Sequence, residues 1–72
     1  MITILGQSLC GETIRCMQHC ELAELSYETH FLFLESKEAV DPRYNKDEHL
    51  PQIVVDGTNI GGFANLIKRF PI

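Results

Sequence analysis

The first half of the chain alternates between the periodicity of a strand and that of a helix, and this order restricts the fold more than any other feature. Residues 1–5 form an apolar, largely β-branched run that Gly6 ends. Small and apolar residues then recur at three- and four-residue steps from about residue 10 to residue 25, the period of a helix with one buried face. Residues 26–34 alternate again as a strand. A strand–helix–strand unit pairs its strands in parallel through a right-handed crossover.

The second half reads as a hairpin followed by a helix. Residues 52–56 are predicted to form a strand centred on the β-branched run Ile53-Val54-Val55. The Asp-Gly pair at 56–57 favours a tight hairpin turn into a short strand over residues 58–60. Two glycines end that strand. Residues 63–70 then carry apolar side chains on one helical face, with a Lys-Arg pair in the last turn and a proline after it.

The stretch between the two halves, residues 35–49, has the weakest pattern. It is rich in charged residues, and Ser36 is a residue type that caps a helix, which would then run through Val40. Pro42 disfavours the helical conformation for the residue before it. We therefore expect a degenerate helix or an ordered loop here.

These elements predict an α/β fold with the order β-α-β-(weak α)-β-β-α, in which a four-stranded mixed sheet is flanked by helices. The chain has 72 residues, so we expect one domain over residues 1–72 with a thin core.

Composition excludes several classes of function. The net charge is −4 and no Lys/Arg cluster is long enough for a basic stripe, so a nucleic-acid partner is not expected. No apolar run approaches a membrane span, and we expect a cytoplasmic protein that does not associate with membranes. Three cysteines is an odd number, which is typical of free thiols in a reducing compartment rather than of a disulfide scaffold.

Cys10 is the candidate nucleophile. It falls at the start of the first predicted helix, where free N–H groups and the helix dipole stabilise a thiolate. Gly11 beside it allows a partner backbone to approach closely. Glu12 acts in the opposite direction, because its negative charge disfavours a nearby thiolate.

Two further motifs precede the last strands and the last helix. Pro51 stands directly before a buried strand, a position that suits a strand's first residue. Gly61-Gly62 before the final helix can expose N–H groups that bind a carboxylate or phosphate. The alternative interpretations are a proline at a strand start and a tight strand-to-helix turn.

Taken together, these segments resemble the glutaredoxin family along nearly the whole chain. The resemblance is carried by Cys-Gly-Glu-Thr from residue 10, by Leu-Pro-Gln-Ile-Val-Val-Asp-Gly from residue 50, and by Ile-Gly-Gly-Phe from residue 60. The corresponding family motifs are a Cys-x-x-Cys or Cys-x-x-Ser at the first helix, a Val-Pro before the third strand and a Gly-Gly before the last helix.

The resemblance implies a thioredoxin-like fold with a glutathione groove. Pro51 would be cis and face Cys10. The backbone of Leu50 would pair with the cysteinyl part of glutathione, and the N–H groups of Phe63 and Ala64 would hold its γ-glutamyl carboxylate.

The sequence departs from the family pattern at three positions. Thr13 replaces the second cysteine, which leaves only a monothiol route, and its hydroxyl can donate a hydrogen bond to the Cys10 thiolate. Gln7 replaces a lysine that would otherwise face the thiolate and glutathione. Ala64 replaces an acidic residue that would contact the glutathione ammonium.

The resemblance therefore implies a thiol–disulfide oxidoreductase, with glutathione as co-substrate and disulfide or glutathionylated proteins as substrates. Cys10 would attack, while Pro51, Gly61 and Gly62 shape the groove, and we expect a monomer. Two alternatives remain. One is a carrier that shares a [2Fe–2S] cluster with glutathione, as monothiol glutaredoxins do. The other is a non-catalytic binding module on the same fold.

Cys16 and Cys20 lie four residues apart on the predicted helix, with His19 between them. This grouping raises the alternative of a metal site. We favour packing, because free cysteine is a common small buried residue, and we predict no resident metal.

Overall fold

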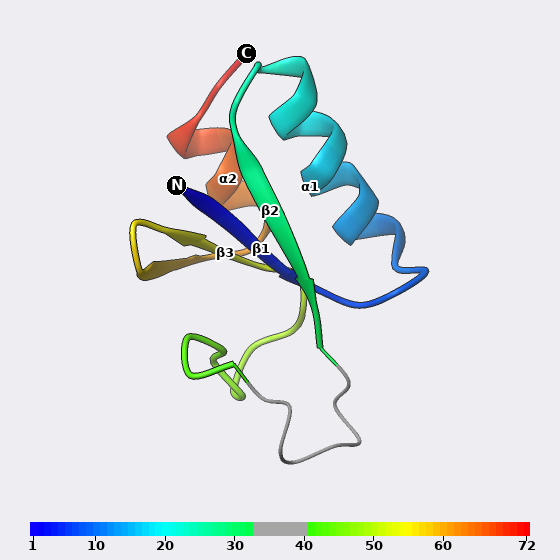
Figure 1. The fold of residues 1–72 in the computed structure, drawn as a ribbon, viewed down its shortest axis with the longest axis vertical. Helices are drawn as coiled ribbons and strands as arrows, with labels where there is room; N and C mark the ends of the chain where they lie inside the picture. The colour runs from blue at the N-terminus through cyan, green and yellow to red at the C-terminus, as the bar shows by residue number, and fades with distance from the viewer. Residues whose placement is uncertain (33–40) are drawn as a thin grey trace.

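The computed structural model describes residues 1–32 and 41–72. Over these residues the order of elements is β1 (Ile2–Gly6), α1 (Gly11–Leu22), β2 (Tyr27–Phe31), β3 (Gln52–Val55), β4 (Thr58–Gly61) and α2 (Phe63–Arg69). The strands form one four-stranded sheet in the order β2-β1-β3-β4 (Figure 1).

The sheet is mixed, as the sequence predicts. β1 and β2 pair in parallel, with Ile2 opposite Tyr27, which confirms the parallel strand–helix–strand unit. β1 and β3 pair antiparallel, and their register places Leu5 opposite Gln52 at the end of the ladder. β3 and β4 form an antiparallel hairpin with an irregularity between Ile53 and Val54.

Both helices cover the same face of the sheet, the face turned away from the viewer in Figure 1. Alternation along the strands sends every second residue toward them, because successive side chains point to opposite faces. The main core cluster accordingly joins strand and helix residues: Ile2, Ile4, Cys16, Cys20, Ile53, Val55 and Leu66. This face holds the larger apolar core.

The opposite face carries a smaller core. Leu5, Leu32 and Val54 form a buried cluster there, and Tyr44 and Leu50 pack against it. Leu5 is fully buried although no helix of the described residues covers this side. The segment over residues 41–50 therefore acts as the cover for this part of the sheet.

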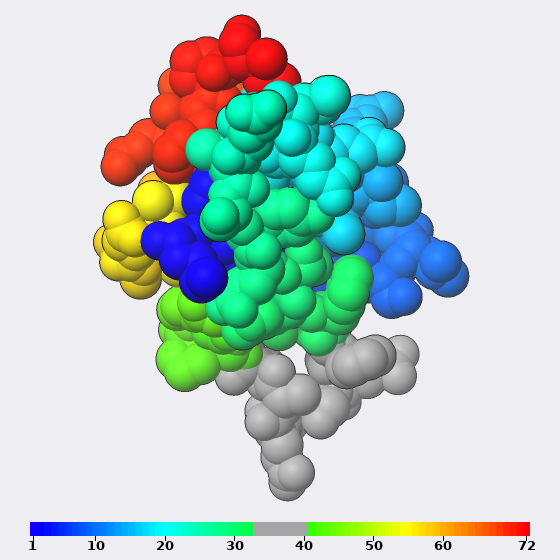
Figure 2. Space-filling view, turned by 45° about the horizontal axis from the view of Figure 1, so that its top comes forward, coloured from blue at the N-terminus to red at the C-terminus, as the bar shows by residue number. Residues whose placement is uncertain are grey.

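The two helices are tied together at the end farthest from the first turn of α1. His19 is buried, and its Nε2 lies 2.7 Å from the carbonyl oxygen of Phe70. Its ring also meets Phe63 edge-on, with the ring centroids 6.4 Å apart. In the space-filling view the C-terminal segment lies against the end of α1 (Figure 2). The helical pattern of the sequence does not indicate that His19 is buried.

The first helix is shorter than predicted. It ends at Leu22 instead of about residue 25, because Glu24 adopts a left-handed conformation with φ 57°. The N–H of Leu25 donates to the carbonyl of Cys20 at 2.8 Å, and the N–H of Glu24 donates to that of Glu21 at 3.1 Å. These two bonds form a Schellman ending, which sequences usually mark with glycine. A glutamate at this position carries no such signal.

Most other boundaries differ by one residue, but β2 already ends at Phe31, so Leu32 lies outside the strand, although the sequence predicts one over residues 26–34. β3 ends at Val55, because Asp56 and Gly57 both have positive φ, 49° and 86°, as a hairpin turn requires. β4 extends to Gly61, and α2 ends at Arg69. The weak helix predicted from Ser36 to residue 40, and the last two residues of the predicted strand 26–34, lie outside the described residues. Residues 41–49 form turns.

Candidate functional site

Cys10 is the N-cap of α1, as predicted from its position after β1. Its backbone is extended, with φ −92° and ψ 122°, and its carbonyl accepts the N–H of Ile14 at 3.1 Å. Its own N–H donates to the carbonyl of Gln7 at 3.3 Å, which closes the loop between strand and helix. Leu9 in that loop is 97% exposed and has φ 62°. The thiol thus sits at a partly exposed helix start.

Thr13 is the main cause of a lowered pKa at Cys10. The hydroxyl and then the N–H of Thr13 stabilise the thiolate by hydrogen bonding and lower the pKa of Cys10. The N–H of Glu12 also lowers it, whereas partial burial and the charge of the Glu12 carboxylate raise it. The lowering effects outweigh the others, so the pKa of Cys10 falls below its ordinary value.

The Thr13 side chain is fixed by the end of β1. It is 1% exposed, and its Oγ1 accepts the backbone N–H of Gln7 at 3.3 Å. With the oxygen engaged as an acceptor, the hydroxyl proton can be directed to the Cys10 sulfur. A Cβ placed on Gly6 would lie 2.4 Å from Thr13 Cγ2 and 2.7 Å from Oγ1. Only glycine therefore fits beside Thr13 in this arrangement.

The other two thiols are core residues. Cys16 and Cys20 are both 0% exposed. Burial raises the pKa of Cys16 to about 12, with a further contribution from Cys20, and burial also raises the pKa of Cys20. The predicted packing role of both residues is confirmed. Cys10 is the only cysteine of the chain that combines exposure with a lowered pKa.

Pro51 and the glycine pair lie next to each other. The Leu50–Pro51 peptide bond is cis, as the resemblance implies. A Cβ on Gly62 would lie 3.6 Å from the carbonyl oxygen of Pro51, so the start of β3 contacts the turn that leads into α2. The β1–β3 ladder ends at the Leu5–Gln52 pair, and Pro51 directly precedes Gln52 in the chain.

Two contacts lie at the strand ends next to the predicted site. Thr13 contacts Gly6 at the end of β1, and Gly62 contacts Pro51, which precedes β3. Cys10 lies less than one helical turn from Thr13. Because Leu5 pairs with Gln52, both contacts lie at the same end of the sheet.

Three further predicted residues have mixed surroundings. The ring of Phe63 is half-buried against the main core. Ala64 is exposed, and neither its N–H nor that of Phe63 has a hydrogen-bond partner within the described residues. Gln7 is half-buried and uses its backbone to hold Thr13. No hydrogen bond joins these three side chains to Cys10 within the described residues.

Gln52, which sequence reasoning placed only as a strand residue, organises the loop in front of Pro51. It is fully buried, and its Oε1 accepts the N–H of Asn45 at 2.8 Å and Asn59 Nδ2 at 2.9 Å. Its Nε2 donates to the carbonyls of Asn45 at 2.7 Å and of Glu48 at 3.2 Å. All four hydrogen-bonding positions of the amide are used. No sequence signal distinguishes such a residue from any polar strand residue.

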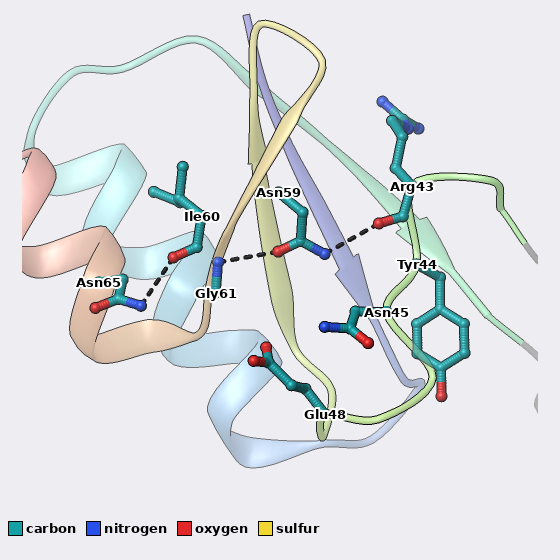
Figure 3. Close-up of a pocket in the computed structure, with 8 residues that line it drawn as sticks. All are labelled: Arg43, Tyr44, Asn45, Glu48, Asn59, Ile60, Gly61 and Asn65. Atoms are coloured by element: carbon teal, nitrogen blue, oxygen red, sulfur yellow. Dashed lines mark hydrogen bonds between the residues drawn. The ribbon is translucent and has the colours of Figure 1, made fainter.

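A cavity of about 270 Å³ lies next to this loop (Figure 3). It shares Gly61 with the predicted groove but is not lined by Cys10, Pro51 or Gly62. The cavity is therefore a second feature, distinct from the thiol site.

Comparison with family models, with curated proteins and with solved structures found no match to this chain. Within residues 1–32 and 41–72, no helix has the length and apolar character needed to cross a bilayer.

Proposed function

We propose that this protein is a glutaredoxin-like thiol–disulfide oxidoreductase on a thioredoxin-like fold, acting on glutathione mixed disulfides through Cys10. The observation that carries the proposal is the contrast among the thiols. One cysteine stands at a helix N-cap with a lowered pKa, and the other two are sealed in the core. The mixed sheet with β1 and β3 at its centre is compatible with a thioredoxin-like arrangement.

The proposed reaction needs one protein thiolate. The Cys10 thiolate attacks the glutathionyl sulfur of a mixed disulfide, and the S–S bond breaks. The substrate's sulfur leaves as a thiolate and takes up a proton, while glutathione remains disulfide-bonded to Cys10. The thiolate of a second glutathione then attacks that glutathionyl sulfur, releasing glutathione disulfide and regenerating the Cys10 thiolate. The net reaction consumes one glutathione thiol: the mixed disulfide and that glutathione become a free substrate thiol and glutathione disulfide, and Cys10 ends as it began.

The surroundings of Cys10 support a monothiol route. Cys16 is six residues further along α1 and 0% exposed, so it is not placed to resolve a disulfide on Cys10. The Thr13 hydroxyl lowers the pKa of the Cys10 thiol without supplying a second thiol. Pro51 and Gly62, which contact each other, would border the peptide-like backbone of glutathione.

Replacing Cys10 by serine tests the proposal. We expect deglutathionylation of a glutathionylated peptide to fall to the uncatalysed rate, because serine is un-ionised at neutral pH and a far weaker nucleophile. The assay follows release of glutathione disulfide in the presence of reduced glutathione. Cys20→Ala is the matched control, since it removes a thiol that is fully buried, and it should keep most of the activity. Activity that survives in Cys10→Ser would refute the proposed role.

A further inference from the structure

The cavity beside β4 has walls from two parts of the chain. Tyr44, Asn45 and Glu48 line it from the loop before β3, and Ile60, Gly61 and Asn65 line it from β4 and α2. Figure 3 shows the side chains of Asn45 and Glu48 on the side of the loop that faces Gly61, with the Tyr44 ring pointing away from them. Because Cys10 does not line it, any ligand here would be held independently of the proposed thiol chemistry.

Both walls are held in place by hydrogen bonds. Gln52 holds the loop through the backbones of Asn45 and Glu48. Asn59 connects the loop to the edge strand, because its Nδ2 donates to the carbonyl of Arg43 at 3.0 Å and its Oδ1 accepts the N–H of Gly61 at 2.9 Å. The cavity is thus formed before any ligand arrives, which limits the entropy lost on binding.

Arg43 lines the cavity, but its guanidinium is already paired with Asp41. The Arg43 guanidinium donates to both carboxylate oxygens of Asp41, at 2.9 and 2.6 Å, and to Thr3 Oγ1 at 3.3 Å. The hydrogen bonds from Arg43 hold the pKa of Asp41 well below its usual range. Figure 3 shows the guanidinium pointing away from Glu48, so Arg43 lines the cavity through its main chain and the base of its side chain.

Glu48 is the other charged residue that lines the cavity. Its carboxylate forms no ion pair or hydrogen bond within residues 1–32 and 41–72, and Figure 3 shows it turned toward Gly61. Asn45 Oδ1 accepts the N–H of Asp47 at 3.0 Å, which leaves its Nδ2 without a partner among those residues. The site therefore offers one anion and one amide donor.

We propose that this cavity binds an arginine side chain presented by a polypeptide. A guanidinium matches a carboxylate through two parallel hydrogen bonds, and Glu48 offers a carboxylate with no partner among the described residues. The free Asn45 amide would donate to a peptide carbonyl of the same ligand. The cavity volume of about 270 Å³ suits one side chain rather than a larger ligand.

Titration with a capped alanine–arginine–alanine tripeptide, followed by amide chemical shifts, tests this site. We expect shifts at Glu48, Gly61 and Asn65, with a dissociation constant on the order of millimolar, because the ion pair is exposed to solvent. Glu48→Gln should weaken binding about fivefold. Asp47→Asn removes the same charge from the same loop without lining the cavity, and it should bind the peptide as the parent protein does.

The tripeptide in which citrulline replaces arginine is the ligand control. Citrulline has the shape of arginine but not its charge. The citrulline peptide should therefore cause no chemical-shift changes, or should bind at least about fivefold more weakly than the arginine peptide. Equal binding of both peptides, or equal loss in Asp47→Asn and Glu48→Gln, would overturn the assignment. Glu48 holds the loop through its backbone, so Glu48→Gln leaves the cavity walls intact, and unchanged thermal unfolding will verify this.

Discussion

Gly6→Ala is expected to destabilise the protein by about 2 kcal/mol and to reduce the reactivity of Cys10. The new Cβ would lie 2.4 Å from Thr13 Cγ2, and the Thr13 side chain has no room to move because it is 1% exposed. The first turn of α1 would have to shift away from the end of β1. A domain of this size has only a few kcal/mol of stability, so chemical denaturation will resolve the change clearly.

The same shift should separate Thr13 from the thiolate it stabilises. We therefore expect the pKa of Cys10 to rise in Gly6→Ala. Gly11→Ala is the matched control: it adds the same methyl group one residue after Cys10, where nothing lies within 4 Å. Because alanine is the better helix former, that variant should be neutral or stabilised by up to about 1 kcal/mol. Equal stability of the two variants would show that Gly6 and Thr13 are not in contact.

Gln52→Leu is expected to destabilise the protein by about 3 kcal/mol. Leucine has a similar size, but it leaves the N–H of Asn45, the Asn59 amide and two loop carbonyls without their partner. A buried polar group left unpaired costs roughly 1–3 kcal/mol, and water can reach part of this loop to replace some of the lost bonds. Denaturation measures the total, and amide hydrogen exchange should show the largest loss of protection at Asn45.

Gln18→Leu makes the same chemical change on the exposed face of α1, and its effect should stay within about 0.5 kcal/mol. The comparison separates the hydrogen bonds of Gln52 from the general effect of adding an apolar side chain. If Gln52→Leu were as stable as Gln18→Leu, the loop over residues 41–50 would not depend on this amide. The cavity beside β4 would then lose its structural basis as well.

The sheet could be predicted from the sequence because its signals are local. The β-branched runs of β1 and β3, the Asp-Gly turn after β3 and the helical period of α1 each lie within a few residues. The end of α1 was misplaced because Glu24 takes a conformation that glycine usually marks. The burial of His19 was missed because its partner, the Phe70 carbonyl, is 51 residues away in the chain.

The sequence likewise predicts the local features of the candidate site but not its long-range contacts. The N-cap position of Cys10 and the neighbourhood of Thr13 follow from local sequence. The contact between Gly6 and Thr13 depends on how α1 packs on the end of β1, and the roles of Gln52 and Asn59 depend on a loop that crosses the sheet. Such contacts arise between distant segments, and polar residues that make them have no characteristic pattern.

Titration of the thiolate absorbance measures directly whether Thr13 lowers the pKa of the Cys10 thiol. Cys16, with its pKa raised to about 12, and Cys20, whose pKa is also raised, stay protonated while Cys10 ionises. The first thiolate signal to appear as the pH rises therefore reports Cys10 alone. Since the thiolate is the nucleophile, the alkylation rate should rise with pH over the same range.

We expect the pKa of Cys10 to lie below that of an ordinary cysteine thiol. It should rise toward the ordinary value in Thr13→Val, because valine keeps the β-branched shape without the hydroxyl. Thr29→Val is the control. The Thr29 hydroxyl is buried in the sheet with no partner among the described residues, so its loss should leave the pKa of Cys10 unchanged. A Cys10 pKa at or above that of an ordinary thiol, or one that Thr13→Val does not alter, would show that Thr13 does not activate Cys10.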